Sequence, residues 1–216
     1  MKVEKQILKG AEELFFRYGL KAITMDDIAK HLGMSKRTIY ENFPTKDSIV
    51  SALLGQHREH SITNIETIRK DSKNAIEEII LTMIHLESMS EMMNPRLLFE
   101  LKKFHPKVWG EFQDFKQKVM LQCIADNMKR GIKQGIYRKE INIDILSRLR
   151  VEQIELAWNP DLYPPAKYDI PAVHLVFLEH FLYGIANLKG HEMIEKYKKS
   201  KNLNVPLWYI KGRIYY

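Results

Sequence analysis

Apolar residues recur every three or four positions along most of this 216-residue chain, and polar residues fill the positions between them. The first such run consists of Val3, Ile7, Leu8, Ala11, Leu14, Phe15 and Tyr18. Its spacing places one apolar stripe on a helix, and Gly19 stands where that helix would end. The same period returns in later segments of the chain, so the hydrophobic pattern predicts an all-α protein.

Residues 24–49 carry signals for two short helices, a tight turn and the start of a third helix. Thr24 precedes two aspartates, so its hydroxyl can cap a helix whose positive end attracts their carboxylates. Ile28 and Leu32 then share one helix face. Gly33 follows at the point where this helix must stop and the chain must turn.

The second of these helices would have one apolar side and one side rich in hydrogen-bonding groups. Ser35 can cap it, and Ile39 and Phe43 share its apolar side. The opposite side carries Lys36, Arg37, Thr38, Tyr40 and Asn42. Such a pair of helices predicts a helix-turn-helix whose second helix can enter a major groove of DNA. An ordinary helical hairpin with solvated basic residues is the alternative, and the agreement of caps, glycine and spacing argues against it.

This stretch resembles the DNA-binding domain of the tetracycline-repressor (TetR) family of bacterial transcription regulators. That family's recognition helix begins Ser-Lys-x-Thr-aliphatic-Tyr-x-x-Phe, and a lysine starts the next helix. The matching positions are Ser35, Lys36, Thr38, Ile39, Tyr40, Phe43 and Lys46. Arg37 stands where many members carry glycine, and Glu41 where aromatic or basic residues are common, so the operator sequence is not predicted. A second resemblance is the Gly-x-x-x-Gly-aliphatic-aromatic turn from Gly131 to Tyr137, which precedes the last two helices of the family.

The resemblance implies double-stranded DNA with a palindromic operator as partner, and it assigns DNA contacts by position. Lys36 and Arg37 are expected at base edges, because these side chains suit the acceptor pair of guanine. Thr38 is expected at a thymine methyl group or a phosphate, and Asn42 at a base or a phosphate. Phosphate contacts are expected from Thr24, Ser35, Tyr40 and Lys46.

The net charge of +7 and the pI near 9.3 favour contact with nucleic acid or an anionic surface without proving either. Cys123 is the only cysteine, so neither a disulfide framework nor a cysteine-rich metal site is available. We find no apolar run with the length of a signal peptide or a membrane span. These features lead us to expect a soluble cytoplasmic protein with no membrane contact.

The polar stretch from Asp71 to Asn74 is the first credible domain boundary, and Asn74 with Glu77 forms a capping pair for a new helix. We expect a helix-turn-helix DNA-binding domain, a linker helix, a helical ligand-binding and dimerisation domain, and a basic, aromatic tail. Their boundaries are 1–48, 49–70, 71–200 and 201–216.

Two predicted helices near the end of the chain, about 143–158 and 172–188, are candidates for a homodimer interface. The second is apolar around most of its circumference, so it must be covered on nearly all sides. The resemblance implies that these helices pair with their copies as a four-helix bundle, whereas the alternative is a core helix of a monomer. The interface residues we expect are Leu149, Leu175, Leu178, Phe181, Leu182 and Ile185.

The resemblance also implies a pocket for a small-molecule effector, whose binding changes the spacing of the two recognition helices and releases DNA. Methionine and aromatic side chains at helical spacing are candidates for its lining, and they suggest a largely apolar ligand. The candidates are Met83, Leu86, Met89, Met93, Phe104, Trp109, Phe112, Phe115 and Trp158. Such a stripe is more often simple core, and that alternative stays open.

We expect no catalytic site, metal or cofactor. His57 and His60 have a spacing that can bind a metal, but no third ligand is evident nearby. Histidines and carboxylates elsewhere lack the spacing of a nucleophile and its base. The expected function is therefore transcriptional regulation, with repression released by the effector. An architectural DNA-binding protein without an effector is the alternative.

Overall fold

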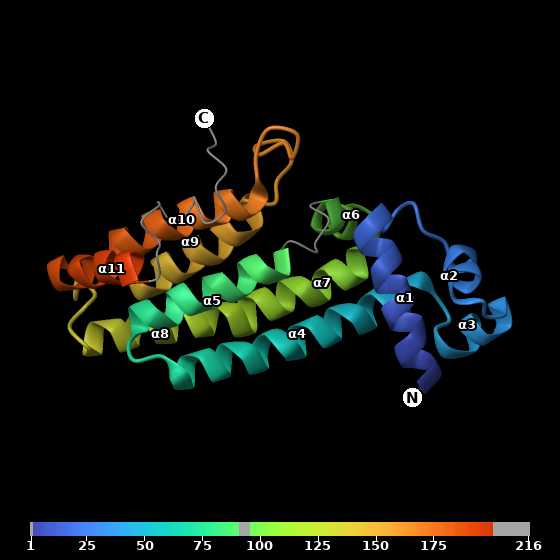
Figure 1. The fold of residues 1–216 in the computed structure, drawn as a ribbon, viewed down its shortest axis with the longest axis horizontal. Helices are drawn as coiled ribbons and strands as arrows, with labels where there is room; N and C mark the ends of the chain where they lie inside the picture. The colour runs from blue at the N-terminus through green and yellow to red at the C-terminus, as the bar shows by residue number, and fades with distance from the viewer. Residues whose placement is uncertain (1, 91–95, 201–216) are drawn as a thin grey trace. The chain divides into compact units, whose positions relative to one another are not determined.

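The computed structural model describes residues 2–90 and 96–200, without the side chains of 83–90, 96 and 200. Helices make up the fold throughout this range, which confirms the predicted all-α class with its N-terminal helix-turn-helix (Figure 1). The chain divides into two compact units. The first comprises residues 1–63 and 92–115, and the second comprises residues 64–91 and 116–216.

The first unit contains the predicted helix-turn-helix and two helices from later in the chain. The first helix ends where the pattern predicted, because Gly19 follows it with a left-handed φ of 84°. The helices of this unit are α1 (Lys2–Tyr18), α2 (Met25–Leu32), α3 (Lys36–Asn42), the first part of α4 (Lys46–Asp71), α6 (Arg96–Phe104) and α7 (Pro106–Phe115).

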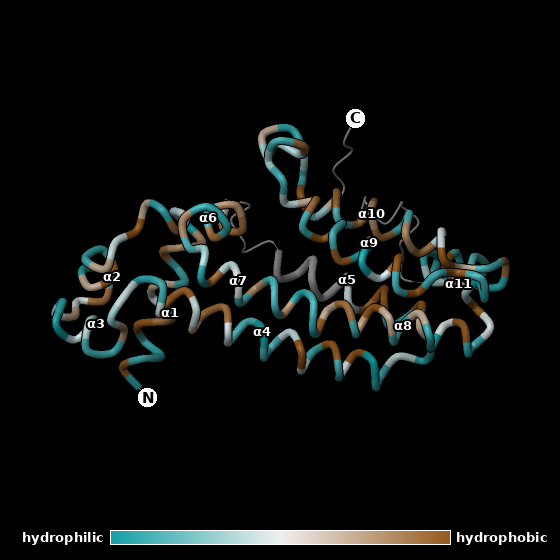
Figure 2. The backbone as a smooth tube through the Cα atoms, turned by 180° about the vertical axis from the view of Figure 1, so that it is seen from behind, coloured by the Kyte–Doolittle hydropathy of each residue, from teal (hydrophilic) through white to brown (hydrophobic). Residues whose placement is uncertain are grey.

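One hydrophobic core joins the first four of these helices. Ile7 of α1, Ile28 of α2, Ile39 of α3 and Ile49 of α4 are all fully buried. Burial of an isoleucine side chain contributes about 1.5–3 kcal/mol. Figure 2 shows both hydrophobic (brown) and hydrophilic (teal) segments along the length of α4.

Helices α6 and α7 belong to the first unit, whereas the sequence-based boundaries placed all of 71–200 in one domain. Three polar contacts connect them to the helix-turn-helix part. His105 Nδ1 lies 2.5 Å from the Asp47 carboxylate, and the Ser51 hydroxyl donates to Glu111 at 2.5 Å. The third is the backbone N–H of Lys21, which donates to Glu100 Oε2 at 2.9 Å. Contacts over such long sequence separations leave no signal in the periodic pattern.

The second unit has a separate core built from the remaining helices. Its elements are the last part of α4, α5 (Ala75–Ser90), the π-helix η1 (Lys116–Met120), α8 (Leu121–Lys133), α9 (Ile143–Leu156), α10 (Ile170–Ile185) and α11 (Leu188–Ser200). Ile76 of α5, Met128 of α8, Leu182 of α10 and Ile194 of α11 all lie in this core. In Figure 1, α9 and α10 run side by side, and the two helices are in contact.

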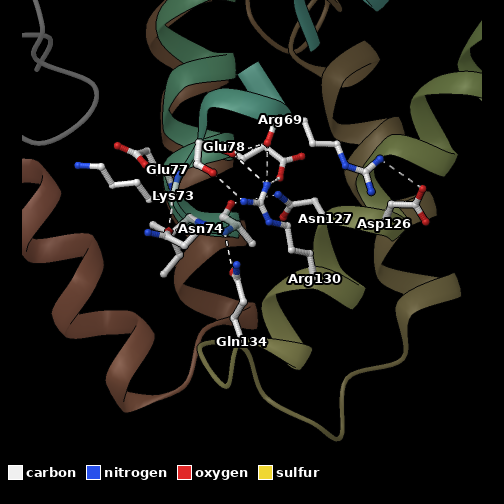
Figure 3. Close-up of polar contacts among 12 residues, drawn as sticks. Arg69, Lys73, Asn74, Glu77, Glu78, Asp126, Asn127, Arg130 and Gln134 are labelled. Atoms are coloured by element: carbon white, nitrogen blue, oxygen red, sulfur yellow. Dashed lines mark hydrogen bonds and ion pairs between the residues drawn. The ribbon is translucent and has the colours of Figure 1, made fainter. Parts of the chain in front are cut away.

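Arg130 of α8 binds the end of α4 within the second unit (Figure 3). Its guanidinium donates to the carbonyl oxygens of Arg69 at 3.0 Å and Ser72 at 2.7 Å, and to the Ser72 hydroxyl at 2.9 Å. It also pairs at 2.8 Å with the carboxylate of Glu78, a side chain only 8% exposed. The single guanidinium therefore supplies hydrogen-bond donors to the carbonyl groups at the end of α4 and also pairs with the buried Glu78 carboxylate.

The predicted cap of α5 is present beside this arginine (Figure 3). The Asn74 side-chain oxygen accepts hydrogen bonds from the backbone N–H groups of Ile76 and Glu77, at 3.1 and 3.0 Å. The Glu77 carboxylate in turn accepts the backbone N–H of Lys73 at 2.6 Å. This confirms the helix start predicted from the Asn74 and Glu77 spacing.

The glycine turn after α8 permits an aromatic ring to lie directly on the helix. A Cβ at Gly131 would stand 2.0 Å from Cδ2 of Tyr137, and the Tyr137 side chain is fully buried. Its hydroxyl donates to Asn127 Oδ1 at 3.2 Å, and Asn127 Nδ2 donates to the carbonyl of Ala75 at 3.0 Å. Gly135 then reverses the chain with a left-handed φ of 68°.

The predicted amphipathic run from Trp109 to Ile132 contains one π-helical turn, η1, between α7 and α8. Lys116, in this turn, is almost completely buried. Its Nζ donates to Glu155 at 2.5 Å and lies 3.1 Å from Glu152. Burial alone would lower the pKa of Lys116, but the hydrogen bonds to Glu155 and Glu152 outweigh it and raise the pKa.

The described chain ends in a helix that the sequence analysis had not delimited. Residues from Leu188 onward form α11, whose Ile194 is fully buried. This segment is rich in lysine, and its single apolar stripe is therefore difficult to recognise in the sequence. Residues 201–216, expected as a tail, lie outside the described residues.

Candidate functional site

The turn of the helix-turn-helix is fixed by side-chain caps and one glycine. Thr24 Oγ1 accepts the backbone N–H of Asp27 at 3.2 Å, and the Asp27 carboxylate accepts both the hydroxyl and the backbone N–H of Thr24. The hydrogen bond from the Thr24 hydroxyl, followed by the backbone one, lowers the pKa of Asp27. Gly33 ends α2 with a left-handed φ of 62°. The Thr24 hydroxyl therefore has a structural role in this module.

Helix α3 presents an apolar side to the core and a polar side to solvent, as predicted. Ile39 is fully buried and Phe43 is 9% exposed. Ser35 caps the helix, because its Oγ accepts the backbone N–H of Thr38 at 3.0 Å. The two inward side chains fix the rotation of α3 about its axis, and this rotation decides which polar residues face outward.

Lys36 and Arg37 are the two cations of α3, and their side chains are 66% and 87% exposed. Lys36 Nζ donates to Asp26 at 2.5 Å, and this hydrogen bond raises the pKa of Lys36. Arg37 Nε donates to Glu41 at 2.7 Å. Exposed ion pairs of this kind contribute only about 0–1 kcal/mol, so either cation can exchange its carboxylate for DNA at small cost.

The other predicted contacts of α3 differ in accessibility. Tyr40 is 47% exposed. Thr38 is partly buried and its hydroxyl lies 2.8 Å from the Ser35 hydroxyl. Asn42 Nδ2 donates to the backbone carbonyl of Thr38 at 2.8 Å. Tyr40 is therefore freer to reach DNA than Thr38 or Asn42.

The Lys46 ammonium group is hydrogen-bonded within the fold, whereas a phosphate contact requires it to reach DNA. Its ammonium donates to the backbone carbonyl of Leu20 and stands 5.8 Å from the centre of the Phe15 ring. Burial lowers the pKa of Lys46. In this structure Lys46 attaches the start of α4 to the link between α1 and α2, and its phosphate contact stays a prediction.

The predicted ligand-lining residues belong to both compact units of the chain. Met93 lies outside the described residues, as do the side chains of Met83, Leu86 and Met89. Trp109 and Phe112 pack against the core of the first unit, and Phe104 is 39% exposed beside Lys21. Phe115 also belongs to the first unit, whereas Trp158 belongs to the second. Trp109 and Phe112 are only partly buried against that core, so their place in a ligand pocket stays a prediction.

The predicted dimer interface also needs a correction. Five of its six residues are at most 6% exposed within a single chain, so their side chains are already covered. They are Leu175, Leu178, Phe181, Leu182 and Ile185. Leu149 is 49% exposed, and Ile145 and Val176 on the same two helices are 60% and 46% exposed. These three residues and Leu156 of α9, which is 40% exposed, are the large apolar side chains of the two helices that face outward and are available to a second chain.

Three polar side chains of α9 and α10, one buried and two partly buried, were not among the predicted site residues. Arg150, Gln153 and His174 each have one buried nitrogen or oxygen atom without a hydrogen-bond partner. The available sequence signal was weak: Arg150 stands four residues from both Leu146 and Ile154, and so occupies an apolar stripe.

Within residues 2–90 and 96–200, His, Cys, Asp and Glu form no group of three or more that could hold a metal ion. His57 instead pairs with Glu12 at 2.6 Å. None of the helices in this same range is both long and apolar enough to cross a bilayer.

Comparisons with known proteins agree with this geometry. Residues 7–53 match the family of bacterial regulatory proteins called the tetR family. The uncharacterized HTH-type transcriptional regulator YvaF of Bacillus subtilis is 30% identical over 167 residues, which span 75% of this chain and 84% of YvaF.

Two solved structures share the fold. A TetR-family transcriptional regulator from Agrobacterium tumefaciens aligns over 86% of this chain and 98% of its own, with a TM-score of 0.72 at 19% identity. SmeT, the repressor of the Stenotrophomonas maltophilia multidrug efflux pump SmeDEF, was solved as a complex with triclosan. That complex aligns over 87% of this chain and 93% of its own, with a TM-score of 0.66 at 17% identity.

Proposed function

The chain belongs to the tetracycline-repressor (TetR) family of bacterial regulatory proteins, and from this premise we propose that it is a homodimeric, sequence-specific repressor of transcription. Members of this family are DNA-binding regulators rather than enzymes. In the proposed mechanism, a small and largely apolar ligand changes the spacing of the two recognition helices and releases the operator.

The observation that carries the proposal is the division of α3 into two sides. Ile39 is fully buried, while Lys36, Arg37 and Tyr40 are exposed on the same short helix. A rigid helix with an accessible row of donors is the form that reads base edges in a major groove. Within this row Lys36 and Arg37 are the proposed base contacts, and Ser35 and Tyr40 the proposed phosphate contacts.

Selection of bound sites from random duplex DNA by the purified protein tests this function. Two recognition helices related by a twofold axis should enrich a palindrome with half-sites about one helical turn apart. Salt-sensitive binding without any enriched motif would contradict the proposal and favour an architectural role.

Arg37→Ala is expected to relax the base preference at one position of each half-site. An arginine that forms two hydrogen bonds with guanine contributes about 1–3 kcal/mol of discrimination, which corresponds to about a 10- to 100-fold change in relative affinity. The measurement is the affinity of wild type and variant for a panel of single-base variants of the selected site.

Arg58→Ala is the matched control, because Arg58 is an exposed arginine of the first unit outside α3. It should leave the order of preference within the panel unchanged. If Arg37→Ala lowered the affinity equally for every site of the panel, Arg37 would be a phosphate contact and not a base contact.

The proposed dimer places α9 and α10 of one chain against the same helices of a second chain. Ile145, Leu149 and Val176 are large apolar side chains exposed on these helices, and a second chain would remove them from water. A twofold interface of this kind matches the twofold symmetry of a palindromic operator. The family's regulators bind operators as dimers, which supports this arrangement.

Val176→Glu, alone or with Leu149→Glu, is expected to convert the dimer into a monomer without unfolding the chain, because both positions are exposed. Loss of the second half-site contact should lower operator affinity by about 100-fold or more, since linked binding modules gain about 10²–10⁴ in avidity. Sedimentation equilibrium and operator titration are the measurements.

Leu188→Glu provides the comparison, because Leu188 is 83% exposed but lies on α11 and not on the proposed interface. It should remain dimeric with unchanged affinity. A Val176→Glu, Leu149→Glu protein that sediments as a dimer would refute the proposed placement.

We propose a small molecule as the effector. Regulators of this family often respond to small molecules, and the SmeT structure contains triclosan. Loss of operator binding on addition of a compound is the test that separates a ligand-responsive repressor from a protein that only organises DNA.

A further inference from the structure

Arg150 places a positive charge inside the second unit, and among the described residues no carboxylate forms an ion pair with it. The side chain is 8% exposed, and its Nη1 is buried with no hydrogen-bond partner. In the part of the chain that the structure describes, its closest specific contact is with the Phe181 ring, whose centre lies 5.7 Å from the guanidinium carbon. Burial lowers the pKa of Arg150 to about 10, so the group is still charged at neutral pH.

Such an arrangement is costly for a purely structural residue. A buried cation loses its hydration, and an aromatic ring returns only part of that free energy. Buried charges in folded proteins are generally paired, and even a buried ion pair can often be replaced by well-packed apolar residues without loss of stability. The cost suggests that Arg150 is kept for a partner outside the chain.

Two further polar groups accompany the cation. Gln153 lies one helical turn after Arg150 on α9, and its buried Oε1 has no partner. The His174 ring on α10 has a buried Nε2 without a partner and stands 5.3 Å from the Trp158 ring. Burial, together with the charge of Arg150, lowers the pKa of His174 to about 4, so its ring is neutral at neutral pH.

The chemistry of the three groups selects a class of ligand. Guanidinium is a permanent donor that favours carboxylates, whereas a neutral imidazole and a carboxamide can each donate or accept. The Phe181 and Trp158 rings beside them favour an apolar body on the ligand. A neutral apolar compound would leave all three polar groups unsatisfied.

We propose that Arg150, Gln153 and His174 form the polar end of the effector site, and that the effector is a carboxylate with an apolar body. This inference rests on the proposed function, because it refines the largely apolar effector to an acid. Arg150 binds the carboxylate, while Gln153 and His174 adjust their hydrogen bonds to its second oxygen or to a neighbouring polar group.

The test is a titration of the full-length protein with pairs of compounds that share one carbon skeleton. The panel contains straight-chain, branched and aromatic carboxylates, each matched by its alcohol, such as octanoate with octanol and cinnamate with cinnamyl alcohol. At least one acid should bind about 10- to 100-fold more tightly than its alcohol, as expected for a hydrogen bond to a charged group. Isothermal titration calorimetry gives both affinities.

Arg150→Met is the decisive variant, because methionine retains much of the side-chain length and removes the charge. It should bind acid and alcohol with similar affinity, and its Tm without ligand should equal or exceed that of the wild type. Arg148→Met is the matched control on the same helix, since Arg148 is exposed and paired with Asp144. It should keep the preference for the acid.

Three results would overturn the inference. The first is a panel in which no acid is preferred over its alcohol. The second is an Arg150→Met protein that keeps the wild-type preference. The third is an Arg150→Met protein that is monomeric or clearly less stable, because the guanidinium would then be satisfied within the folded protein or by a second chain.

These outcomes are separable from failure of the proposed function. Calorimetry decides the anion site even if no palindrome is enriched from random DNA. Conversely, a protein that selects a palindrome but shows no acid preference remains a repressor and lacks only this class of effector.

Discussion

Gly131→Ala is expected to destabilise the second unit by about 3 kcal/mol or more, at or beyond the upper end of overpacking effects. The new Cβ would stand 2.0 and 2.2 Å from two ring carbons of Tyr137. The ring has little freedom to withdraw, because it is fully buried and its hydroxyl is bonded to Asn127, which holds the carbonyl of Ala75. Thermal and urea unfolding measure the effect, with an expected fall in Tm of about 6–12 °C.

Gly110→Ala separates this clash from the general effect of replacing a helical glycine. Gly110 is exposed on α7, and a Cβ there meets no atom within 4 Å. Its replacement should stabilise the protein by about 0.4–1 kcal/mol. The double variant Gly131→Ala, Tyr137→Ala should lose less stability than the sum of the single variants, because a side chain that ends at Cβ has none of the three ring carbons that clash. Additive losses would show that contact with the ring is not the cause.

Arg130→Met should have the next largest effect, a loss of about 3 kcal/mol in the free energy of unfolding of the second unit. Removal of one member of a buried ion pair costs about 3–5 kcal/mol, and the 24% exposure of Arg130 places this case at the lower end. Glu78 would be left as a buried carboxylate without its cation, and the carbonyls of Arg69 and Ser72 would lose their donor. Urea unfolding monitored by circular dichroism gives the difference.

The neighbouring residue supplies the control for Arg130. Lys129→Met removes a cation from the same turn, but its contact with Asp126 is exposed and 3.4 Å long, so the change should stay within about 1 kcal/mol. Adding Glu78→Gln to Arg130→Met should restore part of the lost stability, because the unpaired buried charge disappears. If the double variant were less stable than Arg130→Met alone, the buried charge would not be the source of the loss.

The recognition module was predictable from the sequence because its determinants are local. The Thr24 cap, the Gly33 turn and the Ser35 cap act on backbone groups within three or four residues, and the structure contains all three. The burial of Ile39 follows from helical spacing alone. The exposure of Lys36 and Arg37 could therefore be inferred before any tertiary contact was known.

Other assignments depended on contacts between residues far apart in the chain. The sequence showed that 172–188 must be covered, but only the packing of the second unit revealed that its own chain covers Leu178 and Leu182. The membership of α6 and α7 in the first unit likewise follows from contacts such as His105 with Asp47. Helical periodicity identifies which face is apolar, but it cannot identify the surface that meets it.

The direction of a long polar side chain was also decided by tertiary structure. Lys46 fits the family motif in sequence, yet its ammonium turns toward the carbonyl of Leu20 because that oxygen lies within reach in the folded unit. Arg150 gave no local signal beyond its place in an apolar stripe, and its burial without a counter-ion appeared only when α9 and α10 were packed together. The sequence by itself determined the helices, their caps and the reading face of α3, because these follow from neighbouring residues. Only the tertiary structure decided how the buried charges are partnered, because electrostatic partners are set by distance in space and not by separation along the chain.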